Sequence, residues 1–119
     1  MANFVHQRLE NRIKEIISSM IATQEIKNPN LNSLVAVSEV RLSKDKAYAT
    51  VLITSLEPVE KLKNSLSALQ SASGFIQQRL GTLLQTRHTP RLTFKIDTLF
   101  MESQKVNQLL ESLKIKDEE

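Results

Sequence analysis

The chain has 119 residues, 40% of them hydrophobic and 24% charged, with a formal net charge of +3 at pH 7. This size and balance are typical of one globular domain with a single core and favour neither disorder nor a membrane protein. No apolar run approaches the roughly 20 residues that span a bilayer, and residues 1–10 lack the apolar stretch of a secretory signal. Cysteine is absent, which excludes disulfides and thiol chemistry and is compatible with a reducing cytosol.

The positive charge is concentrated in one part of the chain. Residues 61–96 contain no Asp or Glu, whereas the rest of the chain carries a net negative charge. The bases of this segment are Lys61, Lys63, Arg79, Arg87, Arg91 and Lys95, with His88 beside them. A segregated positive field favours binding to a polyanion, because each neutralised phosphate releases condensed counterions. On charge alone, a solvated basic face without a partner is an equal alternative.

Apolar residues recur at spacings of three and four from residue 4 to about residue 24, which predicts an amphipathic helix. Its apolar stripe consists of Val5, Leu9, Ile13, Ile16, Ile17, Met20 and Ile21. Arg8 and Arg12 lie one turn apart at the edge of the apolar stripe. They either reach outward to phosphate or cover the margin of the core with their stems. Pro29 ends the helix, because the residue before a proline is pushed out of the helical region.

Two alternating stretches, residues 34–43 and 46–54, predict a β-hairpin with a turn through Lys44 and Asp45. One face of the hairpin packs on helices, and the other offers Arg41, Tyr48 and Thr50 to solvent or a partner. The side chains expected on the packed face are Leu34, Ala36, Val40, Leu42, Ala47, Ala49, Val51 and Ile53.

Pro58 suits the first turn of a second helix, which buries Leu62, Leu66 and Leu69. The helical pattern continues to residue 84, but Gly74 interrupts it. The small residues Ala72, Ser73 and Gly74 therefore predict a kink or a junction between two helices.

After Pro90, a third strand points Leu92, Phe94 and Ile96 inward. A last apolar set predicts a short C-terminal helix through Val106, Leu109, Leu110 and Leu113. The expected fold is α+β, with a three-stranded sheet and helices on one face, in one domain over residues 1–113. Residues 114–119 are expected to form a flexible charged end. A crossover between the second and third strands lays them parallel if they are neighbours.

Three blocks of this sequence resemble the bacterial ribosome-binding factor A family: EIKNPNL, VSEVRLSKDKAYATVLIT, and SASGFIQQRLG with RHTPRLTFKID. The resemblance implies a type II KH-like domain in which Ala72, Ser73 and Gly74 form an Ala-x-Gly kink. This kink replaces the glycine-rich clamp with which other KH modules grip the nucleic-acid backbone. Asn28 and Asn30 depart from the acidic residue and arginine common in the family.

The resemblance implies assembly rather than chemistry. Members of the family bind the free small ribosomal (30S) subunit late in its maturation, assist 16S rRNA folding and 5′-end processing, and support growth in the cold. They leave with the help of a ribosome-assembly GTPase. We therefore expect a monomeric, non-catalytic factor of the bacterial cytoplasm, with a plastid origin left open.

No cofactor or metal is expected. With only Gly74 and Gly81 there is no phosphate-binding loop, and His6 and His88 have neither cysteines nor paired carboxylates at ligand spacing. His88 beside Arg87 either contributes to the basic patch or is a structural loop residue.

Nine cations are predicted as a group to face RNA, mainly through phosphates, which position a protein without reading sequence. They are Arg8, Arg12, Arg41, Lys44, Lys46, Arg79, Arg87, Arg91 and Lys95. Two other classes stay open. A KH-like module of another RNA-processing factor would bind free RNA as well as it binds subunits, and a protein-interaction module would have an incidentally basic face.

Overall fold

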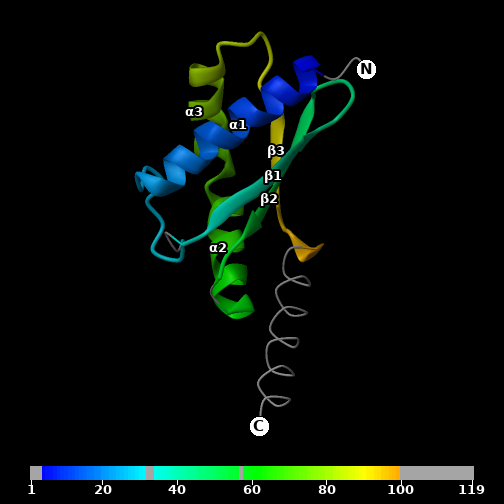
Figure 1. Ribbon diagram of the computed structural model, residues 1–119. Helices are drawn as coiled ribbons and strands as arrows, with labels where there is room; N and C mark the ends of the chain where they lie inside the picture. Colours follow the sequence, from blue (N-terminus) through cyan, green and yellow to red (C-terminus); the bar gives the residue numbers. More distant parts are fainter. Residues whose placement is uncertain (1–3, 32–33, 57, 100–119) are drawn as a thin grey trace, which may run out of the picture.

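A computed structural model describes residues 4–31, 34–56 and 58–99 (Figure 1). In chain order its elements are α1 (Phe4–Ala22), β1 (Ala36–Leu42), β2 (Tyr48–Thr54), α2 (Val59–Ser71), α3 (Ser73–Leu84) and β3 (Arg91–Ile96). The order confirms the predicted α+β fold of helix, hairpin, two successive helices and strand. The helix expected between Val106 and Leu113 lies outside the described residues.

The three strands form one sheet in the order β1-β2-β3. β1 runs antiparallel to β2, and β2 runs parallel to β3 with Tyr48 opposite Arg91. Parallel neighbours need a crossover connection, and α2 and α3 supply it, as the sequence predicted. Because both strands start at the same end of the sheet, the hairpin turn before β2 lies beside the loop before β3. The backbone N–H of Arg91 donates to the carbonyl of Ala47 at 2.8 Å.

A single hydrophobic cluster joins all six elements. Phe94 of β3 has 2% of its surface exposed, and Ile13 and Ile17 of α1 have none. Burial of each such side chain contributes about 1.5–3 kcal/mol relative to exposure. Other fully or almost fully buried members are Met20, Val51, Ile53, Leu62, Leu69, Ile76 and Leu80. The helices therefore cover the face of the sheet that carries these side chains, whereas Glu39, Thr93 and Lys95 on the opposite face are exposed.

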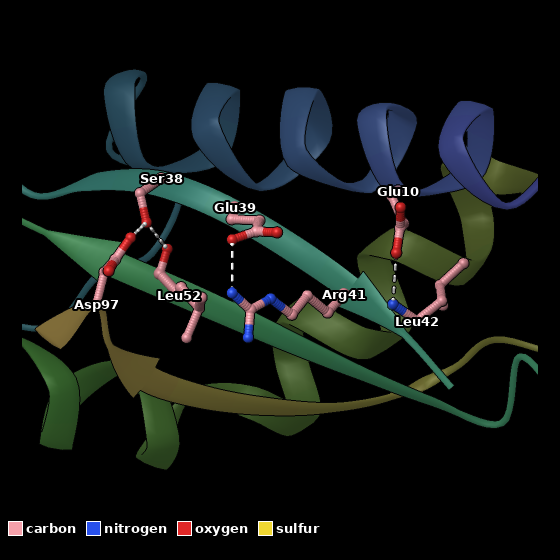
Figure 2. A network of polar contacts seen from close by, with 7 residues as sticks. All are labelled: Glu10, Ser38, Glu39, Arg41, Leu42, Leu52 and Asp97. Atoms are coloured by element: carbon pink, nitrogen blue, oxygen red, sulfur yellow. Dashed lines mark hydrogen bonds and ion pairs between the residues drawn. The ribbon is translucent and has the colours of Figure 1, made fainter. Parts of the chain in front are cut away.

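The predicted alternation of β1 is wrong in its first half. Leu34 is 60% exposed and Ala36 is also exposed, whereas Val35 and Val37 are buried. The cause is a bulge: Val37 pairs with Ile53 and Glu39 with Leu52, which leaves Ser38 as an extra residue on β1. After the bulge, Val40 and Leu42 face inward as predicted. The Ser38 hydroxyl donates to the Asp97 carboxylate at 2.7 Å, which links the bulge to the end of β3 (Figure 2).

Two side chains one turn apart attach α1 to the edge strand β1. The Glu10 carboxylate accepts the backbone N–H of Leu42 at 2.8 Å (Figure 2), and Nε2 of His6 contacts the carbonyl of Ser43 at 3.0 Å. A carbonyl only accepts, so Nε2 of His6 carries the proton. These contacts occupy one flank of the buried stripe of α1. By helical periodicity Arg8 and Arg12 lie on the other flank.

The crossover helices meet at Ala72, which has φ −90° and ψ 4°. Helical hydrogen bonding continues across the junction, from the N–H of Ile76 to the carbonyl of Ala72 at 2.9 Å. Gly74 does not have a positive φ, and a Cβ at that position would meet nothing within 4 Å. The backbone of α3 therefore does not require glycine there.

Gly81, in the last turns of α3, is a site of close approach. A Cβ at this residue would lie 2.6 Å from Oγ1 of Thr89. The loop between α3 and β3 consequently rests directly against the helix. That contact fixes where residues 85–90 run beside the end of the sheet.

We predict opposite effects for one substitution at two positions of α3. Gly74→Ala is expected to raise the free energy of unfolding by about 0.5–1 kcal/mol, because alanine favours the helix and open space surrounds it. Gly81→Ala is expected to lower it, because Thr89 must move. Urea unfolding of both variants measures the difference.

The double variant Gly81→Ala with Thr89→Ala serves as the control. It is expected to be more stable than Thr89→Ala alone, since removal of Oγ1 leaves room for the new Cβ. Equal stabilisation by Gly74→Ala and Gly81→Ala in the parent chain would contradict the close approach of Thr89.

Candidate nucleic-acid interface

A groove of about 700 Å³ lies at the end of the sheet where β2 and β3 begin. Three segments meet there: the N-terminal half of α1, the hairpin turn and the loop after α3, all at the upper end of Figure 1. We call it the cationic groove. Its lining residues are Val5, Arg8, Leu9, Arg12, Asp45, Lys46, Ala47, Leu84, Thr86, Arg87 and His88.

The groove concentrates positive charge. The side chains of Arg8, Arg12, Lys46 and Arg87 are all exposed, and none forms an ion pair with a carboxylate of the described residues. Repulsion among them is unfavourable in the free protein and is relieved when an anion binds. The groove therefore favours a ligand that carries several negative charges.

Asp45 is the one carboxylate among the described lining residues, and it serves the turn. Its Oδ1 accepts the Ser43 hydroxyl at 2.7 Å and the backbone N–H of Ala47 at 3.0 Å. These hydrogen bonds, the one from Ser43 first, hold the pKa of Asp45 below its usual range. Asp45 therefore stays ionised at neutral pH. Its carboxylate accepts hydrogen bonds within the turn that carries Lys46.

Lys46 occupies a strained backbone conformation. Its φ is 61°, and its N–H donates to the carbonyl of Ser43 at 3.0 Å. This turn position usually carries glycine, because the left-handed region costs a residue with a Cβ about 1–2 kcal/mol. Here it carries a cation whose side chain lines the groove. Strain at such a position is characteristic of binding sites.

Three of the residues that line the groove have large apolar side chains, and we call them together its floor. They are Val5, which is 61% exposed, and Leu9 and Leu84, which are partly buried at the margin of the core. Sequence reasoning placed Val5 and Leu9 on the buried stripe of the first helix and did not find them as site residues. Periodicity shows which side of a helix is apolar. It does not show where along the helix that side stops packing against the core and becomes exposed.

Five of the nine predicted cations lie outside the groove. Arg91 and Lys95 are exposed on the outward face of β3, and Arg41 on β1 contacts Glu39 at 3.1 Å. Arg79 on α3 contacts Glu25 at 3.4 Å. Lys44 is exposed in the hairpin turn. The structure thus brings four predicted cations together and distributes the others over the sheet face, the turn and the side of α3.

The junction at Ala72, Ser73 and Gly74 lies at the opposite end of α3 from the cationic groove. A separate hollow of about 510 Å³ adjoins it, lined by Ala72, Phe75 and residues that follow α1. Phe75 is 49% exposed. The junction and the groove are therefore distinct places on the surface.

No group of three or more His, Cys, Asp or Glu in the described part of the chain is arranged to hold a metal ion. None of its helices combines the length and the apolar character that crossing a membrane requires.

The fold and the groove define a small α+β domain with exposed cations gathered at one end of its sheet. The sequence model of the family described as Ribosome-binding factor A matches residues 5–110. The chain belongs to this family, as the resemblance predicted.

Individual relatives agree over most of the chain. A Finegoldia magna ribosome-binding factor A is 36% identical over 90% of this chain and 88% of its own length. The crystal structure of the Thermus thermophilus factor aligns with a TM-score of 0.64 and 30% identity, over 76% of this chain and 93% of that one. A homology model of the Thermus factor, fitted into the cryo-EM map of a 30S complex, aligns with a TM-score of 0.61 and 31% identity, covering 74% and 90%.

We predict that Lys46→Gly makes the fold more stable and weakens the binding of phosphate groups in the groove. Relief of the left-handed strain, less the added chain entropy of glycine, is expected to raise the free energy of unfolding by about 0.5–1 kcal/mol. The same variant is expected to elute from phosphocellulose at lower salt. Urea unfolding and salt elution measure the two effects.

Two controls separate strain from charge. Gln24→Gly also relieves a positive φ, of 60°, and should gain stability without a change in elution. Lys63→Gln removes one exposed charge on α2, away from the groove, and should shift elution less than Lys46→Gly. Equal shifts for the two lysine variants would show that the groove has no special affinity for phosphate.

Proposed function

We propose that this protein is a non-catalytic ribosome-binding factor that binds the free 30S subunit and assists late 16S rRNA folding and 5′-end processing, including in the cold. The observation that carries the proposal is the cationic groove, in which four exposed cations lack carboxylate partners among the described residues. The related Thermus thermophilus factor, fitted into the map of its 30S complex, supports the choice of polyanion.

Binding alone is sufficient for this role. A protein that prefers one arrangement of the rRNA shifts the population toward it by the difference between its affinities for the two. The groove cations contact phosphates, and the exposed Arg41, Arg91 and Lys95 add contacts on the sheet face. No cofactor takes part, and the factor works as a cytoplasmic monomer that a ribosome-assembly GTPase helps to release.

The strand order and the helix junction support a type II KH-like domain. The order α1-β1-β2-α2-α3-β3, with β3 parallel to β2, fits that interpretation. The α2–α3 junction at Ala72 stands where other KH modules have a glycine-rich clamp. Cations without a carboxylate partner among the described residues cluster instead around the far end of α3. The main rRNA contact is therefore assigned to the cationic groove.

Charge reversal in the groove is expected to weaken binding to 30S subunits. Arg8→Glu with Arg87→Glu should lower retention roughly tenfold at moderate salt and reduce the slope of log affinity against log salt by about two, one unit for each lost phosphate contact. Co-sedimentation with purified 30S subunits at rising salt measures both. Lys63→Glu reverses an exposed charge outside the groove and should behave as the parent.

The same experiment distinguishes the other classes of protein. Equal retention of the groove variant and Lys63→Glu would remove the groove from the interface. Equal binding to subunits and to unrelated free RNA would indicate a general KH-like module. Capture that survives ribonuclease treatment would indicate a protein partner.

The processing role is tested in cells. A strain without this protein should accumulate 16S rRNA precursors with extended 5′ ends and grow slowly at low temperature, because misfolded intermediates persist longer in the cold. The parent chain and Lys63→Glu should restore processing, and Arg8→Glu with Arg87→Glu should not. Primer extension of 16S rRNA provides the measurement, and normal 5′ ends in the strain without the protein would contradict the role.

A further inference from the structure

The floor of the cationic groove requires its own explanation. Phosphates bind to a hydrated row of cations and need no apolar surface beneath them. Yet Val5, in the first turn of α1, is 61% exposed and lines the groove together with Arg8 and the partly buried Leu9 and Leu84. Contact with an apolar part of a ligand would remove this surface from water.

The largest apolar surfaces of RNA are the faces of its bases, and their availability depends on pairing. In an A-form duplex the bases are stacked, and a protein meets phosphates, ribose hydroxyls and a shallow minor groove. Such a surface matches the groove cations but leaves the floor without a partner. Unpaired nucleotides present both phosphates and free base faces.

The walls of the groove also suit free bases. Arg8, Arg12 and Arg87 carry planar guanidinium groups, and His88 adds an exposed imidazole ring. Both kinds of plane stack on unpaired bases. Stacking tolerates any base, so a site of this kind has little sequence preference.

We propose that the cationic groove binds an unpaired stretch of RNA, with a base against Val5, Leu9 and Leu84 and the adjoining phosphates at the groove cations. The inference rests on the proposed function for its choice of RNA. It adds that the strand at this site is single-stranded.

The test compares two RNAs that carry the same number of phosphates. One is an unstructured single strand, and the other is a blunt duplex, each with a fluorescent label. Anisotropy titration of the full chain at fixed salt is expected to give at least about tenfold tighter binding of the single strand. Arg8→Glu with Arg87→Glu should weaken binding of both RNAs.

A pair of matched valine variants tests the floor. Val5→Ser is expected to weaken single-strand binding about fivefold and to leave duplex binding unchanged, because only a base contacts the floor. Val59→Ser, in the first turn of α2 and 40% exposed, should change neither. Both sites are exposed, so the fold tolerates the changes, and urea unfolding confirms it.

Two results would overturn the inference. The first is that the parent chain binds the two RNAs with equal affinity, or binds neither of them at low salt. The second is that Val5→Ser binds the single strand as tightly as the parent chain does. After either result the proposed function still holds if the double variant Arg8→Glu with Arg87→Glu is retained less on 30S subunits than the parent chain. Loss of the proposed function is recognised separately, by the absence of any 30S retention in the parent chain.

Discussion

The parallel pairing of β2 with β3 determines where the cationic groove lies. Both strands begin at one end of the sheet, so the turn before β2 and the loop before β3 lie side by side. The hydrogen bond from the N–H of Arg91 to the carbonyl of Ala47 joins them directly. An antiparallel third strand would have carried Arg87 and His88 to the opposite end of the sheet, away from Lys46.

Three further contacts complete the arrangement. His6 and Glu10 attach α1 to the end of the hairpin, which turns the flank with Arg8 and Arg12 toward the loop after α3. Gly81 lets that loop rest on α3 through Thr89. The cations are therefore positioned by backbone pairing and packing, and their own side chains remain available for a ligand. Positioning of this kind lowers the entropy lost on binding.

Hydrophobic periodicity predicted the six described elements, because each buries a regular stripe or face. It failed at the start of β1, where Leu34 and Ala36 alternate with the equally apolar Val35 and Val37. Either pair suits a strand, and only the bulge at Ser38 decides which is buried. The pairing of Arg79 with Glu25 was also beyond the sequence, since that contact depends on how α3 packs against the segment after α1.

The contact between Glu10 and Leu42 has a consequence for contacts between molecules. β1 is an edge strand, and an exposed edge is a template on which another chain can add a strand. Because the Glu10 carboxylate occupies the N–H of Leu42, an incoming strand would have to displace a charged acceptor before it could pair there. The contact that orients α1 thus also protects this part of the edge against aggregation.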